Sequence, residues 1–189
     1  MTKTSIPMTT EPLAPEFSRL IELATLSAAG IHREIQAEPA EREALARRFD
    51  LAAIAVLTAQ LDVVPIRSGG VTGARVTGRF AARVTQTCVV SLERFESDLA
   101  ERIELDLLPP AVLEAGEDAD LYHDQDVEPL EGSVLDIGEL VAQHLSLALD
   151  PHPRRPGVSF EPARGLNADP DASAGSKPFA ALGDLKRKM

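Results

Sequence analysis

The chain has 189 residues with 30 acidic and 19 basic side chains, a formal net charge of −11, and 44% of its residues are hydrophobic. This length and apolar content fit one domain with its own core, and the negative charge argues against a broadly cationic surface that coats nucleic acid. The one cysteine excludes a disulfide framework within the chain and any multi-cysteine metal site, and no apolar run suits a membrane span or a signal peptide, so we expect a cytoplasmic protein.

The N-terminal third of the chain predicts two short strands and a helix. Residues 1–15 are expected to be a disordered N-terminus. Residues 17–26 and 31–37 alternate weakly, and each predicts a strand. A helix is predicted over residues 39–49, where proline stands at the first position, acids come early and arginines come late, as the helix dipole favours.

Three runs with a two-residue period follow and predict an antiparallel meander. In residues 74–92 the apolar side chains hold one parity and the polar ones the other, as in a strand with one buried face. The turn residues at 68–70 lead back to a run at 57–63, and a third run at 99–107 stops at two prolines. Because residues 74–92 are long for one strand, we expect a bend or bulge near Gly78.

The polar parity of the long run carries a stripe of arginines, namely Arg75, Arg79 and Arg83. If that strand face is exposed, the stripe is a local cationic patch that could contact RNA. The alternative is ordinary cross-strand pairing with acids such as Glu101 or Glu104, which contributes little to stability for each pair.

An acidic segment at residues 114–131 interrupts the periodic pattern. It holds eight carboxylates and lacks the residue order of a calcium-binding EF-hand loop, so it predicts a solvated loop. Electrostatic steering would also allow it to dock a basic partner. The candidate docking residues in this segment are Glu117, Asp118, Asp120, Asp124 and Asp126.

A second helix is predicted after this segment. Asp136 can cap it, and Glu139 stands three residues later, as in a capping box. One face of the helix is apolar and comprises Ile137, Leu140, Val141, Leu145, Ala148 and Leu149. Residues 16–153 are therefore the expected folded domain.

The C-terminal residues 154–189 differ in composition from the rest of the chain. They hold seven basic and four acidic side chains and are rich in proline, so we expect a flexible tail. At its end, Phe179, Leu182 and Leu185 recur at three-residue spacing. These three are candidate docking residues of a short amphipathic segment.

No constellation in the sequence predicts catalysis, a cofactor or a metal site. The four histidines lack the spacing of a helical metal site, and no phosphate-binding glycine motif is present. Cys88 falls on the apolar parity, where a buried structural thiol is the simplest interpretation. We assign no catalytic, cofactor-binding or metal-binding residue and expect a protein that is not an enzyme; an enzyme of unknown type is the third alternative.

Four segments in chain order carry a family resemblance: residues 39–49 (PAEREALARRF), 84–93 (VTQTCVVSLE), 135–141 (LDIGELV) and 177–182 (KPFAAL). Together they resemble the YceD family of bacterial proteins, the large ribosomal RNA subunit accumulation proteins, over residues 16–189. The family-motif residues given a structural role are Cys88, Asp136, Gly138, Glu139 and Leu140. Many members carry Cys-x-x-Cys after the long strand, but here Ser91 holds the second position, so a zinc or redox role is not carried over.

The resemblance implies a cytoplasmic, non-enzymatic factor needed for accumulation of 23S ribosomal RNA, through its synthesis, processing or stability. The net charge favours indirect action through a large-subunit ribosomal protein or an rRNA-processing factor, with the acidic segment facing this partner. Direct RNA binding through the arginine stripe is the alternative. We expect no cofactor, membrane or small-molecule substrate.

The expected fold is α+β. It combines a curved, mainly antiparallel sheet with flanking helices and a flexible C-terminal tail. Closure of the sheet into a barrel is one alternative for this pattern.

Overall fold

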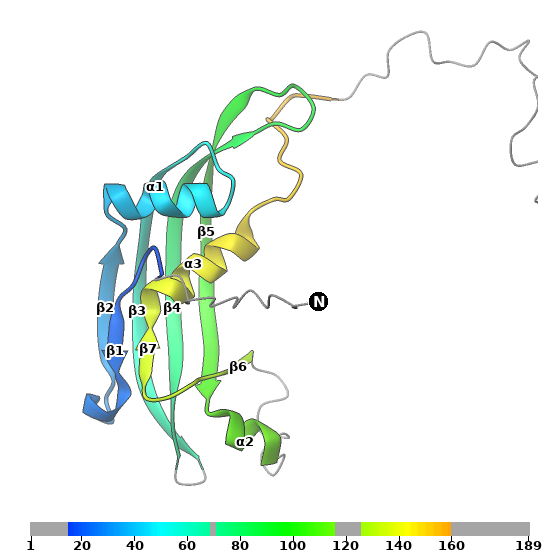
Figure 1. Cartoon of the computed structure of the whole chain (residues 1–189). Helices are drawn as coiled ribbons and strands as arrows, with labels where there is room; N and C mark the ends of the chain where they lie inside the picture. The colour runs from blue at the N-terminus through cyan, green and yellow to red at the C-terminus, as the bar shows by residue number, and fades with distance from the viewer. Residues whose placement is uncertain (1–14, 69–70, 116–125, 160–189) are drawn as a thin grey trace, which may run out of the picture. The chain divides into compact units, whose positions relative to one another are not determined.

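The computed structural model describes residues 15–68, 71–115 and 126–159, which form an α+β fold on a five-stranded sheet (Figure 1). The strand order is β2-β3-β4-β5-β6, for β2 (Ile31–Gln36), β3 (Ala53–Ser68), β4 (Val71–Thr87), β5 (Arg94–Leu108) and β6 (Val127–Pro129). Neighbouring strands are antiparallel except β5 and β6, which are parallel. The α+β class and the mainly antiparallel sheet are confirmed, but the sheet is open, with β2 and β6 at its ends, and is not a barrel.

The predicted meander is β3-β4-β5, and alternation along β4 gives it one buried face. The apolar side chains at even-numbered positions from 74 to 84 are each at most 4% exposed; they are Ala74, Val76, Phe80, Ala82 and Val84. On the opposite parity, Arg79 and Arg83 are exposed, and Arg75, Thr77 and Thr85 are partly buried. The two-residue period therefore decides which side of the sheet becomes the core.

The long strand ends earlier than predicted. β4 stops at Thr87, and the next residues form a turn in which the Cys88 N–H donates to the Glu93 carbonyl and the Leu92 N–H donates to the Cys88 carbonyl. Leu92 adopts a φ of 59° and is 77% exposed. The alternation of the sequence continues through this turn, which is why periodicity alone extended the strand to residue 92.

The predicted bulge at Gly78 is not present. Register runs unbroken through Gly78 with both neighbouring strands, and the register shift lies between Ile54 and Val56 of β3. Gly78 serves a different purpose, because a Cβ at this position would collide with the carbonyl oxygen of Gln60. The glycine therefore permits a close approach of backbones rather than an extra residue.

Helices and a second, two-stranded sheet cover the core face. The helices are α1 (Pro39–Arg48), α2 (Pro110–Ala115) and α3 (Ile137–Ala148), and β1 (Leu20–Glu22) pairs antiparallel with β7 (Val134–Asp136). Figure 1 shows α1, α3 and the β1–β7 pair on the same side of the large sheet. No helix within the described ranges is long and apolar enough to cross a membrane.

The remaining element predictions have mixed outcomes. Both main helices and strand β2 are confirmed, whereas the predicted strand at 17–26 is reduced to β1 because the 3₁₀ turn Leu23–Thr25 follows it. The predicted loop at 114–131 contains strand β6, which pairs with the end of β5. Residues 1–14, 116–125 and 160–189 lie outside the described residues, and with them the predicted N-terminus, most of the acidic segment and the tail. The domain boundaries stay predictions.

The N-terminus of α1 is held by a capping box that the sequence analysis missed. The side chain of Glu38 caps the helix, and the Glu41 carboxylate accepts from the Glu38 N–H at 2.7 Å. Glu41 also accepts from both terminal guanidinium nitrogens of Arg19, at 2.7 and 2.9 Å. This hydrogen bond lowers the pKa of the Glu41 carboxyl and ties the N-terminal segment to α1.

Asp136 anchors α3 to the N-terminal segment. Its Oδ1 accepts from the N–H groups of Gly138 and Glu139 at 3.0 and 3.2 Å, which confirms the predicted cap. The same oxygen accepts from the Arg19 N–H at 2.7 Å. Gly138 is required here, since a Cβ would lie 2.6 Å from the Phe17 carbonyl oxygen.

Glu139 does not complete a capping box but joins the two main helices. Its carboxylate accepts from both terminal nitrogens of Arg48, at 2.9 and 2.8 Å. Arg48 also pairs with Glu16 at 3.0 Å. Leu140 is 5% exposed and packs in the core as predicted.

We predict that Asp136→Ala lowers the free energy of unfolding by about 2 kcal/mol, because the helix loses its cap and the Arg19 N–H loses its acceptor. Urea unfolding measured by circular dichroism tests this value. Asp136→Asn is the matched control and should cost much less, since asparagine caps as well as aspartate. If both variants lost the same free energy of unfolding, Asp136 would not stabilise the protein through the helix cap.

Candidate interaction face of the sheet

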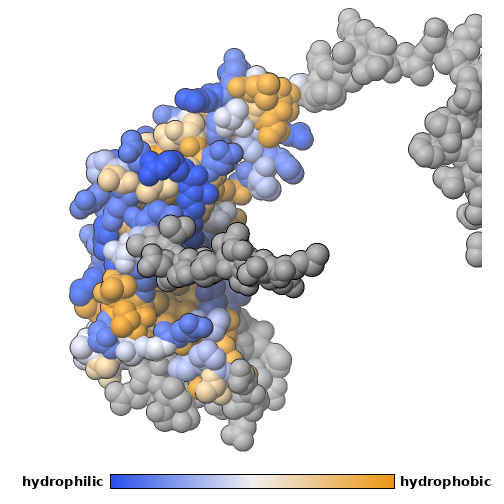
Figure 2. All heavy atoms as spheres, in the orientation of Figure 1, coloured by the Kyte–Doolittle hydropathy of each residue, from blue (hydrophilic) through white to orange (hydrophobic). Residues whose placement is uncertain are grey.

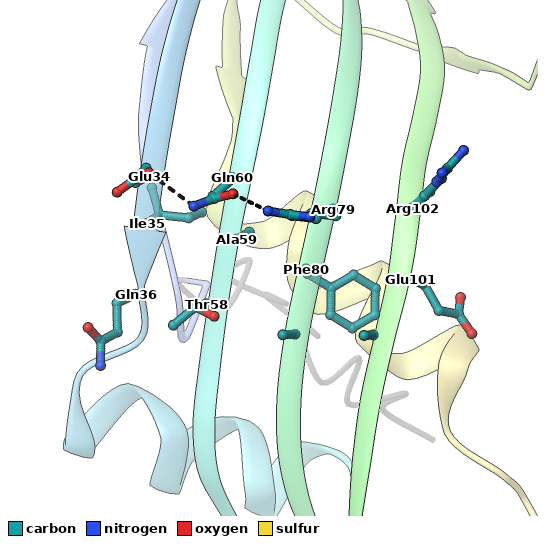
Figure 3. Close-up of a pocket in the computed structure, with 12 residues that line it drawn as sticks. Glu34, Ile35, Gln36, Thr58, Ala59, Gln60, Arg79, Phe80, Glu101 and Arg102 are labelled. Atoms are coloured by element: carbon teal, nitrogen blue, oxygen red, sulfur yellow. Dashed lines mark hydrogen bonds between the residues drawn. The ribbon is translucent and has the colours of Figure 1, made fainter.

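The side of the sheet opposite α1 and α3, here called the outer face, carries the predicted arginine stripe. Register aligns its side chains in rows across β2, β3, β4 and β5, and one row reads Glu34, Gln60, Arg79 and Arg102. Figure 3 views this row from the outer face, with α3 behind the strands. The outer face is a single surface because each row has the same parity.

Two arginines of the stripe are paired with aspartates of β5. Arg75 reaches Asp106 through Nε at 2.7 Å and through Nη2 at 2.6 Å, and the Asp106 side chain is only 2% exposed. Arg83 pairs with Asp98 at 2.7 Å, where both side chains are more than half exposed. The bond from Arg83 lowers the pKa of the Asp98 carboxyl. The first pair is therefore the stronger structural contact.

These partners correct the pairing expected from the sequence. Glu101 lies opposite Phe80, on the parity of the core face, so it cannot meet the stripe. Glu104 lies on the outer face opposite Thr77. Cross-strand pairing with acids is thus confirmed as a type of contact, but the acids are Asp98 and Asp106, because register and not distance along the chain decides which residues meet.

Arg79 occupies the centre of the outer face beside a hollow. It donates to Gln60 Oε1 at 3.0 Å, and Gln60 donates to Glu34 at 3.0 Å (Figure 3). On its other side, Arg79 lies directly opposite Arg102 in β5. The neighbouring row includes the small side chains of Thr58, Ala81 and Ala100. A groove of about 830 Å³ lies over these two rows.

Charges of both signs alternate across the outer face. Among the described residues, outer-facing positions of β2–β5 hold six carboxylates and five arginines. The carboxylates are Glu34, Asp62, Glu96, Asp98, Glu104 and Asp106, and the arginines are Arg75, Arg79, Arg83, Arg94 and Arg102. The face therefore has no excess of positive charge, and only the Arg79–Arg102 pair concentrates cations.

The turn after β4 places Cys88 among hydrogen-bond donors. The thiol is fully buried, and the Ser91 N–H donates to Sγ at 3.4 Å. Hydrogen bonds from the side chain and backbone of Ser91, then from the Arg155 backbone, lower the pKa of the Cys88 thiol to about 6. Burial of Cys88 is confirmed, and the inert character of its thiol stays a prediction.

This turn also carries exposed apolar side chains. Val89 is 47% exposed and its N–H donates to the Pro153 carbonyl at 2.9 Å, while Leu92 is 77% exposed. Figure 2, seen from the helix-covered side, shows hydrophobic surface at the end of the β4–β5 hairpin. The turn is the point where the chain after α3 returns to the sheet.

The other predicted site residues fall into two groups. Asp126 is exposed, and its carbonyl oxygen accepts from the Asp106 N–H at 2.9 Å. The remaining docking candidates lie outside the described residues; they are Glu117, Asp118, Asp120, Asp124, Phe179, Leu182 and Leu185. Within the described ranges, no group of three His, Cys, Asp or Glu side chains could hold a metal ion.

Comparison with known proteins identifies the family. The model of the family described as "Large ribosomal RNA subunit accumulation protein YceD" matches residues 76–186, more than half of the chain. The chain belongs to the YceD family. The YceD match begins in β4 and includes β5, the Cys88 turn and α3. No curated protein and no solved structure matches the chain.

Arg102 is a further outer-face residue that the sequence did not predict, besides Asp98 and Asp106. Arg102 lies in a run whose alternation predicts a strand, and it has the same parity as Glu104, which the sequence suggested as a partner of the stripe. Its position opposite Arg79 depends on the register between β4 and β5, which no local pattern contains.

The lowered pKa of Cys88 predicts a pH-dependent stability. Because the folded pKa of about 6 lies below the ordinary 9.0, the thiolate stabilises the folded state fully above pH 9, and this contribution falls with pH and is lost below about pH 6. Urea unfolding should show that the difference between wild type and Cys88→Ser grows from pH 6 to pH 9.

Ser91→Ala is the companion variant for this measurement. Loss of its side-chain hydrogen bond should raise the pKa of Cys88, which the ultraviolet absorbance of the thiolate reports. A thiol that titrates at its ordinary value in the wild-type protein would contradict the role of these donors.

Proposed function

We propose that this protein is a non-enzymatic cytoplasmic factor that supports accumulation of 23S ribosomal RNA by binding a basic protein, either a large-subunit ribosomal protein or an rRNA-processing factor. The description of the YceD family supports the link to large-subunit ribosomal RNA. The protein-partner part is supported by one observation: the described outer face has six carboxylates against five arginines, and the three arginines of its stripe already bind neighbouring side chains.

Direct contact between the stripe and RNA would disrupt existing interactions. For Arg75 to bind a phosphate, it would have to leave Asp106, whose side chain is 2% exposed. Leaving a buried carboxylate without its partner costs roughly 3 kcal/mol or more. Arg83 can leave Asp98 more easily because both side chains are exposed. RNA affinity arises mainly from cations free to neutralise phosphates, and this face has no cationic excess.

A protein partner suits the charges of the chain better. The chain carries a net charge of −11, and electrostatic attraction would steer it toward basic proteins. Ribosomal RNA repels a polyanion of the same sign at long range. We therefore assign the acidic residues to the partner interface, with Asp126 as the docking candidate that lies within the described residues.

Direct RNA binding is the second candidate, and the Arg79–Arg102 pair favours it. Two arginines at directly opposite strand positions beside a groove could both turn toward an anion such as a phosphate, once Arg79 leaves Gln60. This arrangement would place one or two phosphates at the centre of the outer face rather than along the whole stripe.

The two accounts predict different outcomes in a capture experiment with the full chain. We expect large-subunit ribosomal proteins or rRNA-processing factors to be retained from cell lysate after ribonuclease treatment, and to be released as salt rises, because exposed charges are screened. Mass spectrometry identifies the retained proteins. Retention that disappears with ribonuclease would support the RNA account instead.

Arginine variants distinguish the protein-partner account from the RNA account without the capture experiment. Arg79→Gln/Arg83→Gln leaves the buried Arg75–Asp106 pair intact and should restore the 23S to 16S ribosomal RNA ratio in cells that lack the protein as fully as wild type does. Arg33→Gln/Arg47→Gln, at exposed positions away from the outer-face arginines, is the matched control. Failure of the first variant alone would favour RNA contact, and an unchanged ratio in cells lacking the protein would overturn the proposed function itself.

A further inference from the structure

The long strand β5 has a free edge. β4 pairs with one side of it from Arg94 to Leu107, whereas on the other side β6 pairs only with Asp106, Leu107 and Leu108. No described strand pairs with the second side of β5 between Arg94 and Leu105. Figure 1 shows this edge uncovered along most of the strand. A long row of unpaired backbone groups is a template for another strand.

The direction of these backbone groups follows from contacts at the end of β5. The Asp106 N–H donates to the Asp126 carbonyl, and the Leu108 carbonyl accepts from the Leu130 N–H. Even-numbered residues of β5 therefore point their N–H and C=O groups toward the free side, since the direction alternates along a strand. The same positions carry the outer-face charges of β5.

We propose that two copies of this chain pair through the free edges of β5, antiparallel and centred on Leu99, so that their two five-stranded sheets become continuous. In this register Glu96 lies opposite Arg102 of the second copy, and Arg94 lies opposite Glu104. The two-fold axis repeats both pairs, so four ion pairs cross the junction. Opposite charges at directly facing positions stabilise a strand pair.

Charge singles out this register among its neighbours. Centring the pair on Asp98 would place that aspartate opposite itself and Arg94 opposite Arg102. Centring it on Ala100 would place Glu96 opposite Glu104, which offsets the favourable facing of Asp98 and Arg102 in that register. Centres at residues 97 and 101 each bring two acids together, Glu96 with Asp98 or Asp98 with Glu104. Facing like charges destabilise each of these alternatives.

Side chains within one copy are arranged consistently with this partner. Arg102 faces Arg79 within its own sheet, and Figure 3 shows its guanidinium directed toward the open side of β5. Asp98 would face Ala100 of the second copy and could keep its bond to Arg83. On the core side, the partly buried Phe95 would meet Ile103 of the second copy, and Leu99 would meet its own counterpart.

Sedimentation equilibrium of the full chain over a concentration series tests the proposal directly. The expected species at high concentration has about twice the 20.3 kDa of one chain. Either single reversal, Glu96→Arg or Arg102→Glu, places like charges opposite each other twice per dimer and should raise the dissociation constant about tenfold or more. Arg47→Glu, an equal charge change on the exposed side of α1, should leave it unchanged.

Mixing the two reversed variants gives the sharper test. A heterodimer of Glu96→Arg with Arg102→Glu regains opposite charges at both Glu96–Arg102 positions, so an equimolar mixture should associate like wild type. The double variant Glu96→Arg/Arg102→Glu should also self-associate. Ala100→Pro removes an outward N–H and should give a folded monomer, because proline is tolerated at an edge position whose N–H faces solvent.

A disulfide reports the register itself. In a Cys88→Ser background, Leu99→Cys places two thiols at the axis, in a non-hydrogen-bonded pair whose Cα separation of about 4.5 Å allows a disulfide. Glu101→Cys, which would face Ser97, should not cross-link. The proposal would be overturned if the protein stayed monomeric at every concentration, as it would if a different protein occupied this edge. It would also be overturned if neither charge reversal weakened the dimer, or if the two cysteine variants cross-linked equally.

Discussion

Alternation along β4 is the constraint on which the other layers of this domain depend. Even-numbered positions from Ala74 to Val84 bury apolar side chains, with Gly78 among them, and odd-numbered positions face away from the helices. Since register passes this parity to β3 and β5, the whole meander has one apolar face and one charged face. The helices cover the first face because only that face gains from burial.

Polar contacts join the elements of the covering layer to one another. Asp136 joins the start of α3 to the backbone of Arg19, whose guanidinium binds Glu41 of α1. Arg48 at the end of α1 binds Glu139 of α3. The two helices and the N-terminal segment are therefore linked to one another over the sheet. Each of the three carboxylates, Glu41, Asp136 and Glu139, connects elements that are far apart in the chain.

An uncovered face and an uncovered edge are what this architecture leaves for interaction. The outer face has arginines and acids in nearly equal number, so it is suited to a partner that presents both charges rather than to a uniform polyanion. The edge of β5 presents ordered backbone groups, and its charge sequence is complementary to itself when two copies pair antiparallel about Leu99. The two surfaces share Arg102, so occupation of the edge would change the charge balance at the centre of the face.

Sequence alone determined the parts of this protein that depend on local chemistry. Periodicity located the meander, and Pro39 and Asp136 marked the starts of the two main helices, because a strand's parity and a helix's cap are properties of neighbouring residues. The same reasoning failed where the alternation of apolar and polar residues continues beyond the end of a strand. After Thr87 a turn replaces β4 although the alternation continues. It also predicted a bend or bulge near Gly78, since a glycine has the same local signature whether it permits an insertion or a close approach.

Tertiary structure decided which residues meet. The partners of Arg75 and Arg83 are acids 31 and 15 residues away, and Arg79 faces Arg102 because of a register that hydrogen bonds across strands impose. The lowered pKa of Cys88 depends on the fold of the turn that brings the Ser91 donors to its sulfur. The uncovered edge of β5 exists because β6 pairs with only its last residues. Such contacts depend on the relative position of distant segments, and the energy of packing and strand pairing, not any local pattern, sets that position.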